Sequence, residues 1–87
     1  MYQISLKDLA LKSQLPFEDL SKNILIESIH DDSRKVTMGS LFIVKKGIMT
    51  SGELFIEEAI RRGAVAIAGP RSIVKKYSLP KIFFDSP

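Results

Sequence analysis

Two short polar segments hold the residue types with which this 87-residue chain could do chemistry. Asp32-Ser33-Arg34 supplies a carboxylate, a hydroxyl and a guanidinium, and residues 47–52 form a glycine-flanked stretch that reads Gly-Ile-Met-Thr-Ser-Gly. Both segments interrupt apolar sequence, as loops with binding groups do on a rigid scaffold. We expect any specific ligand of this chain to bind at these two segments.

The glycine-flanked stretch has the G-x-x-x-x-G spacing of a phosphate-binding loop. Such a loop continues with Lys and then Ser or Thr, but here Glu53 and Leu54 follow. A carboxylate would repel the β- and γ-phosphates, and no hydroxyl is placed to bind Mg²⁺. The stretch therefore does not predict an ATP site. A loop that follows a strand of a parallel sheet is still a place where α/β proteins bind ligands.

The residues indicate neither a metal site nor a complete active site. His30 is the only histidine, and Asp31 and Asp32 follow it. Neighbouring residues of an extended chain point to opposite faces, so these three do not converge on one ion. There is no cysteine and no G-x-S-x-G nucleophile motif. We predict no catalytic residue and no metal ligand in this chain.

A structural interpretation of Asp32-Ser33-Arg34 is favoured on composition alone. Asp32 would stabilise a turn through hydrogen bonds to nearby backbone. Arg34 would pair with a carboxylate or carbonyl of the next loop.

Composition narrows the class of protein. With 45% hydrophobic and 26% charged residues, the chain is expected to fold, and its length leaves room for one core. The net charge of +3 is scattered in pairs such as Lys45-Lys46 and does not form a stripe with aromatics, so we expect no nucleic-acid partner. The apolar runs are too short to span a bilayer, so we expect no membrane partner. The N-terminus lacks the apolar centre of a signal peptide, so we expect a cytoplasmic protein.

The pattern of apolar residues predicts an α/β fold. Ser5 and Asp8 are spaced to cap a short N-terminal helix that ends before Pro16. Residues 15–20 should be irregular. We expect the helix and this irregular stretch together to seal one edge of the core. From residue 41 onward the order is β-α-β-α-β with short connections. We therefore predict one domain, residues 1–87, that is three-layer-like with a mostly parallel sheet joined by right-handed crossovers. The expected strands are residues 24–29, 41–44, 64–68 and 81–84, and the expected helices are residues 53–63 and 70–77.

The helix expected over residues 53–63 is amphipathic and should serve as scaffold. Acidic residues precede basic ones along it, as suits the helix dipole. Its apolar face holds Phe55, Ile56, Ala59 and Ile60, and its polar face holds Glu57, Glu58, Arg61 and Arg62.

An ordered series of motifs resembles the N-terminal domain of Mur ligases, the ATP-dependent enzymes that add amino acids to the UDP-linked peptidoglycan precursor. The series is most similar to the MurE type, which adds the third residue to UDP-N-acetylmuramoyl-L-alanyl-D-glutamate. The resemblance covers residues 29–68 well and the flanks loosely. The series consists of Asp32-Ser33-Arg34, Gly39-Ser40-Leu41-Phe42, Gly47, Gly52, Phe55-Ile56-Glu57-Glu58-Ala59-Ile60 and Gly63-Ala64-Val65-Ala66.

The resemblance implies which residues bind substrate. Ser33 would contact the UDP-sugar, with the backbone of Asp31 beside it. A serine hydroxyl and loop amides could satisfy uracil and diphosphate acceptors, and apolar side chains could cover the base. Ile48, Met49 and Thr50 would complete the pocket, while Asp32, Arg34, Gly47 and Gly52 would support it.

The sequence departs from the family pattern in this loop. The family commonly has a tripeptide with His after the first glycine and Asp before the second, where this chain has Ile48-Met49-Thr50 and Ser51. No G-K-T/S sequence occurs, so we expect the central ATP-binding domain to be absent, and the C-terminal domain with it. We expect an isolated or shortened domain, not catalytic alone and without a cofactor of its own. ATP and Mg²⁺ are implied for the full-length enzyme, whose other two domains would be its partners.

Two alternatives stay open at this point. The same fold could be a non-catalytic docking module, with Ile48 and Met49 as an exposed apolar contact. The chain could also be the domain of a sibling Mur-type ligase, since the domain does not reveal which amino acid is added. A downstream G-x-x-G-K-T/S motif in the reading frame would favour a ligase, and a stop codon after Pro87 would favour the docking module.

Overall fold

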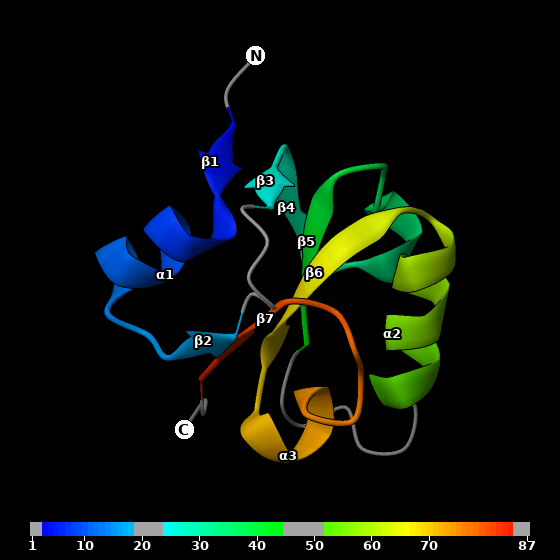
Figure 1. Ribbon diagram of the computed structural model, residues 1–87. Coiled ribbons are helices and arrows are strands. Elements are labelled where there is room, and N and C mark those ends of the chain that lie inside the picture. The colour runs from blue at the N-terminus through cyan, green and yellow to red at the C-terminus, as the bar shows by residue number, and fades with distance from the viewer. Residues whose placement is uncertain (1–2, 19–23, 45–51, 85–87) are drawn as a thin grey trace.

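In a computed structural model of the protein, which describes residues 3–18, 24–44 and 52–84, a five-stranded sheet forms the centre (Figure 1). Its strand order is β2-β7-β6-β5-β4, and β1 and β3 form a separate two-stranded sheet. The strands are β1 (Ile4–Ser5), β2 (Phe17–Glu18), β3 (Leu25–Ile26), β4 (Ser28–His30), β5 (Ser40–Ile43), β6 (Ala64–Gly69) and β7 (Lys81–Phe83). The helices are α1 (Leu6–Ser13), the 3₁₀ turn η1 (Ser33–Lys35), α2 (Gly52–Arg61) and α3 (Arg71–Val74).

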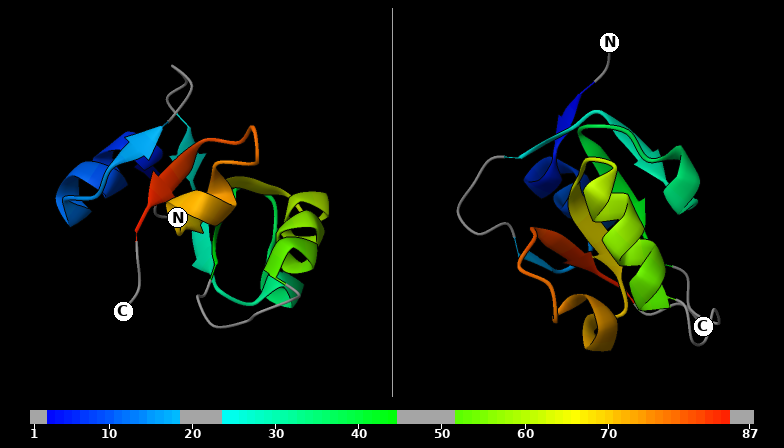
Figure 2. Two further views of the ribbon diagram at one scale, coloured as in Figure 1. Left: turned by 90° about the horizontal axis from the view of Figure 1, so that it is seen from below. Right: turned by 90° about the vertical axis from the view of Figure 1, so that its right-hand side faces the viewer.

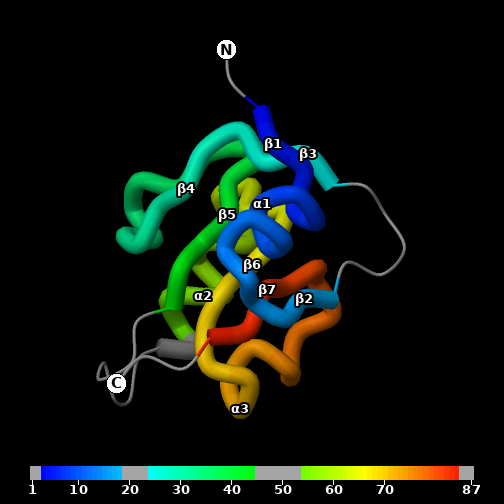
Figure 3. Tube along the Cα trace, turned by 90° about the vertical axis from the view of Figure 1, so that its left-hand side faces the viewer, coloured from blue at the N-terminus to red at the C-terminus, as the bar shows by residue number. Residues whose placement is uncertain are grey.

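In the five-stranded sheet, strands β4, β5, β6 and β7 run parallel, and β2 is antiparallel to its neighbour β7. The mostly parallel sheet of the sequence prediction is therefore confirmed. Figure 2 shows the sheet between α1 on one side and α2 on the other, and Figure 3 looks onto the face that α1 covers. The domain thus has three layers.

Alternate residues of the central strands fill two cores, one on each face of the sheet. Leu41, Ala66 and Ile82 pack with Leu6 and Ala10 of α1. Their sequence neighbours Phe42, Ile67 and Phe83 point the other way, toward Ile56 and Ala59 of α2 and Val74 of α3. The continuous apolar runs of the sequence exist because successive side chains of a strand face opposite sides, and both sides are covered.

Helix α1 begins as its cap predicts. Ser5 is extended, and its Oγ accepts a hydrogen bond from the backbone N–H of Asp8 at 3.0 Å. The helix ends at Gln14, which has a φ of 58°. Leu6 and Ala10 are buried against the sheet, so α1 covers a face of the core, whereas we had expected this part to seal an edge.

Several strands and helices differ from the expected ones. The strand expected over residues 24–29 is divided, because Leu25 and Ile26 pair with β1 while Ser28 to His30 join the main sheet. Between them, the N–H of Glu27 donates to the carbonyl of Gly39. Phe17 and Glu18 form the edge strand β2 where irregular chain was expected, held in part by an ion pair from Lys81 Nζ to Glu18 Oε1 at 3.2 Å.

The two later helices differ from the sequence pattern in length and in burial. Helix α3 ends at Val74 and not near Tyr77. In α2, the apolar face is buried at Ile56 and Ala59 but exposed at Phe55 and Ile60. A short helix packed against one face of a sheet buries a narrower stripe than the sequence offers.

Gly63 fixes the place where α2 gives way to β6. Its φ is +112°, and a Cβ there would lie 2.7 Å from the Cα of Met38. The Gly63 carbonyl also accepts a hydrogen bond from the N–H of Gly39 at 3.0 Å. Only glycine fits this close approach, which sets α2 against the segment that leads into β5.

Candidate functional site

The first polar segment follows the carboxyl end of β4, which lies beside the carboxyl end of β5 in the parallel sheet. Strand β4 ends at His30 and leads into Asp31, Asp32 and the turn η1. Strand β5 ends at Ile43 and leads toward the glycine-flanked stretch. Parallel strands have their carboxyl ends at the same edge, which is where α/β sheets bind ligands. Gly47, Ile48, Met49 and Thr50 lie outside the described residues, and Gly52 begins α2.

Asp32 builds the turn η1 through its carboxylate. Oδ1 accepts hydrogen bonds from the backbone N–H of Arg34 at 3.0 Å and from Arg34 Nε at 3.1 Å, and Oδ2 accepts one from Arg34 Nη2 at 3.0 Å. The hydrogen bonds from the Arg34 side chain, and then the one from its backbone, lower the pKa of Asp32 to about 2. Arg34 therefore pairs inside its own turn, not with a group of the next loop.

Ser33 joins this turn to α2. Its residue is 5% exposed, and its Oγ donates a hydrogen bond to Glu58 Oε1 at 2.8 Å. The other carboxylate oxygen of Glu58 accepts a hydrogen bond from Arg62 Nε at 3.2 Å. The hydrogen bond from Ser33 is the first cause that lowers the pKa of Glu58 below its ordinary value, and Arg62 adds to it. The contacts Ser33–Glu58–Arg62 thus link η1 with α2 and with the residue that follows the end of α2.

Glu58 is the residue that sequence reasoning missed, since the helix was taken as scaffold and Glu58 as part of its outer face. Ser33 and Glu58 are 25 positions apart. Nothing in either segment marks them as partners, because the contact arises only when α2 packs beside η1. The residues before η1 are less enclosed: His30 is half-buried at the end of β4, and Asp31 is exposed.

The arrangement suits binding better than covalent catalysis. A serine nucleophile needs a base that takes its proton, but the lowered pKa makes the Glu58 carboxylate a weaker base than an ordinary one. Among residues 3–18, 24–44 and 52–84, no three His, Asp or Glu side chains form a group that could hold a metal ion. In the same ranges, no helix is long and apolar enough to cross a membrane.

A second polar group lies at the other end of β4 and β5. Ser40 is fully buried, its Oγ lies 2.8 Å from Ser28 Oγ, and it accepts a hydrogen bond from the N–H of Thr37 at 3.1 Å. These hydroxyls satisfy one another at the first residues of two paired strands. They hold the strands in register and are distant along the strands from the Ser33 turn.

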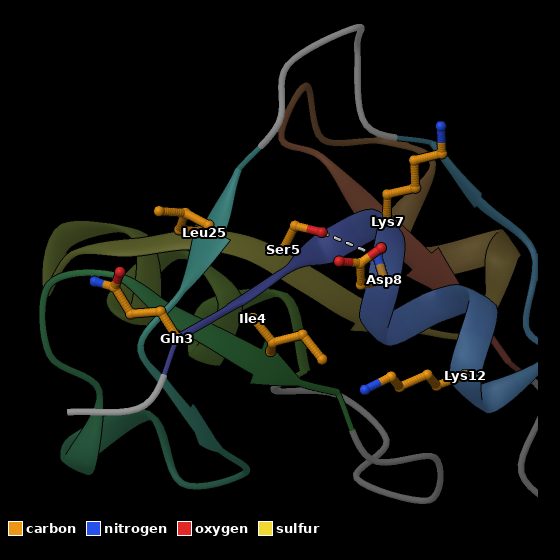
Figure 4. Close-up of a pocket in the computed structure, with 7 residues that line it drawn as sticks. All are labelled: Gln3, Ile4, Ser5, Lys7, Asp8, Lys12 and Leu25. Atoms are coloured by element: carbon orange, nitrogen blue, oxygen red, sulfur yellow. Dashed lines mark hydrogen bonds between the residues drawn. The ribbon is translucent and has the colours of Figure 1, made fainter.

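An open hollow of about 650 Å³ lies beside the start of α1 (Figure 4). Its side chains include both basic and acidic groups, and none of the predicted site residues is among them. It is lined by Gln3, Ile4, Ser5, Lys7, Asp8, Lys12 and Leu25.

Comparison with known proteins gives one family and one fold. A family profile described as "Mur ligase family, catalytic domain" matches residues 25–80. Over 51 residues the chain is 55% identical to a UDP-N-acetylmuramoyl-L-alanyl-D-glutamate–2,6-diaminopimelate ligase of Alkaliphilus oremlandii, covering 59% of this chain and 10% of that protein. Over 85 residues it is 35% identical to the ligase of the same name from Brucella melitensis, covering 97% of this chain and 17% of that protein.

The structural comparison agrees. MurF from Acinetobacter baumannii superposes with a TM-score of 0.73 at 19% sequence identity, over 95% of this chain and 18% of that one. At this identity the likeness concerns the fold alone. The chain spans a small part, between a tenth and a fifth, of each of these proteins.

Proposed function

The chain belongs to the Mur ligase family of peptidoglycan precursor ligases, and from this premise we propose that it binds the UDP-sugar part of the precursor. The relatives with the highest identities quoted above are named as ligases that act on UDP-N-acetylmuramoyl-L-alanyl-D-glutamate. We extend that substrate to this chain, as the domain that holds the nucleotide of a MurE-type ligase in the cytoplasm. The partners are then the UDP-sugar peptide and the central and C-terminal domains of the complete enzyme.

The position of Ser33 carries this proposal. Ser33 follows a parallel strand at its carboxyl end, and its hydroxyl is held in place by Glu58. A fixed hydroxyl close to the exposed residue Asp31 can bind the polar edge of a nucleoside without reorganising. Asp32 and Arg34 hold the turn, and Ile48, Met49 and Thr50 are proposed to complete the pocket from the neighbouring loop.

We propose that ATP and Mg²⁺ bind outside this chain. The stretch over residues 47–52 continues with Glu53 and Leu54 and so lacks the lysine and the hydroxyl of a phosphate loop. Both groups belong to the proposed complete ligase, and this chain supplies substrate binding only.

A titration with UDP-N-acetylmuramoyl-L-alanyl-D-glutamate tests the proposal. NMR detects binding with millimolar Kd, which suits a domain that supplies part of an interface. We expect saturable shifts in the wild-type spectrum and, for Ser33→Ala, a Kd about tenfold higher, as for a lost hydrogen bond in a partly buried site. Ser13→Ala, at an exposed serine of α1, is the control and should bind as wild type. An unchanged Kd in Ser33→Ala would remove Ser33 from the site.

A docking module of the same fold is the second candidate. Leu54 is 65% exposed and Phe55 is also exposed, and both lie in the first turn of α2, next to the segment that contains Ile48 and Met49. An apolar surface of this kind suits a protein partner. The reading frame distinguishes the candidates, because a downstream G-x-x-G-K-T/S motif belongs to a ligase.

A further inference from the structure

The hydrogen bond between Ser33 and Glu58 has a fixed direction. An ionised carboxylate can only accept hydrogen bonds, and the lowered pKa keeps Glu58 ionised at neutral pH. The proton in the 2.8 Å contact therefore belongs to Ser33 Oγ. A serine hydroxyl has one proton to donate, and here it is already used. What remains on Oγ for any other partner is its capacity to accept.

Both ends of this hydrogen bond are held in place. Ser33 is the first residue of η1, which the Asp32 carboxylate caps. Glu58 is held by Arg62, which follows the last residue of α2 and whose Nε lies 3.2 Å from the second carboxylate oxygen of Glu58. To turn its proton toward a ligand, Ser33 would have to leave a charged acceptor, which is the stronger kind of hydrogen bond.

The charged groups near the hydroxyl are already paired with one another. The Glu58 carboxylate pairs with Arg62, and the Asp32 carboxylate pairs with Arg34. A phosphate oxygen at Ser33 Oγ would find no proton there, because the one proton is donated to Glu58. A neutral donor such as an imide N–H or a sugar O–H would instead meet the Ser33 oxygen. Because the Ser33 hydroxyl donates to the Glu58 carboxylate, this oxygen is more negative and accepts more strongly.

We infer that Glu58 is a positioning residue that accepts the hydrogen bond of the Ser33 hydroxyl, so that Ser33 recognises a hydrogen-bond donor of the nucleoside and not a phosphate or carbonyl oxygen. The inference rests on the proposed function and deepens it. It differs from the sequence-based expectation that the Ser33 hydroxyl satisfies acceptors of uracil and diphosphate. It also assigns a role to a helix residue that was taken as scaffold.

Methylated ligands test the direction of the hydrogen bond. The uracil N3–H, the ribose 2′-OH and the ribose 3′-OH of the UDP-sugar can each be blocked by one methyl group. Kd values for the parent and the three methylated ligands would be measured by NMR titration with wild type and Ser33→Ala. For wild type we expect one analogue to bind about tenfold more weakly than the parent. In Ser33→Ala that penalty should fall below about threefold, because the acceptor is gone, and the analogue that shows this loss identifies the donor.

Glu58→Ala tests the positioning role. Without the carboxylate, the Ser33 hydroxyl can rotate and either donate or accept, so the penalty for the blocked ligand should fall from about tenfold to about threefold. Glu57→Gln is the control, since it removes a charge from the neighbouring, exposed position of α2 and should leave the penalty unchanged. A residue with a merely structural role would change stability or all Kd values together, not the ratio between parent and blocked ligand.

The outcomes separate this inference from the proposed function. If the parent ligand causes no saturable shifts in wild type, the proposed function fails. If the parent binds and Ser33→Ala weakens it, but no methylated ligand shows a penalty that depends on Ser33, the proposed function stands and the donor inference is overturned. A penalty that stays at about tenfold in a folded Glu58→Ala variant overturns the positioning role.

Discussion

Two buried serines, Ser5 and Ser33, use their hydroxyls in opposite directions. Ser5 is 8% exposed and accepts a hydrogen bond at 3.0 Å from a backbone N–H three residues ahead. Ser33 is 5% exposed and donates one at 2.8 Å to a carboxylate 25 positions away. The first contact completes a helix with atoms of that helix, and the second joins two separate elements. At Ser33, the partner that fixes the direction of the hydroxyl lies in another element, α2. The Ser33 oxygen can then only accept a further hydrogen bond.

The two serines also differ in the parts of the fold that surround them. Ser5 lies between α1, which packs through Leu6 and Ala10 on the sheet, and an open hollow with side chains of both charges. Ser33 lies in the turn that follows the carboxyl end of β4, where its hydroxyl contacts Glu58 of α2. We therefore propose that the region around Ser5 serves stability and that the region around Ser33 binds the ligand.

Leu6→Ala is the strongest test of the region around Ser5. Leu6 is fully buried next to that serine, so the free energy of unfolding should fall by about 3 kcal/mol. Denaturant unfolding followed by circular dichroism measures it. Leu11→Ala, at a position of α1 that is 57% exposed, should change stability by less than about 0.5 kcal/mol. Equal effects of the two substitutions would show that α1 is not held through Leu6.

Ser5→Ala should lower stability without changing ligand binding. Loss of a serine N-cap costs about 1 kcal/mol of unfolding free energy. The Kd for the UDP-sugar peptide should stay within about twofold of wild type, in contrast to the roughly tenfold weakening expected for Ser33→Ala. If Ser5→Ala weakened ligand binding as much as Ser33→Ala does, the two regions would not differ in function.

The sequence could predict the region around Ser5 because its contacts are local. Ser5 and Asp8 form a recognisable cap, and the apolar runs over residues 41–44 and 64–68 correctly indicated strands covered on both faces. The pairing of Phe17 with Ile82 and of Ser33 with Glu58 joins distant segments, and no propensity or spacing encodes it. The division of the strand over residues 24–29 has the same cause, since two different partner strands take up its two halves.

Acidic pH should lower the stability of the fold by a smaller amount, chiefly through Asp32 of the η1 turn. Folding lowers the pKa of Asp32 from its ordinary value of 3.8 to about 2, so the unfolded chain takes up this proton first as the pH falls. The stabilisation by Asp32 is then complete above about pH 4 and is lost as the pH falls toward about 2. Glu58, whose pKa is also lowered, contributes with the same sign.

Thermal unfolding between pH 5 and pH 2 measures this contribution. Asp32→Asn keeps an oxygen that can cap η1 but loses the charge that pairs with Arg34. Its Tm should therefore fall less steeply than the wild-type Tm over this range. Parallel curves for the two proteins would mean that the Asp32–Arg34 pair is not formed in solution.

The most direct test of the account is a map of where the UDP-sugar peptide binds. Backbone amide shifts are measured during titration of the wild-type chain with UDP-N-acetylmuramoyl-L-alanyl-D-glutamate. We predict that the largest changes fall at Asp31, Asp32 and Ser33 and at Glu58 of α2, with little change from Ser5 to Lys12. Changes concentrated around Ser5 and the hollow beside α1, with the Ser33 turn unaffected, would contradict the account.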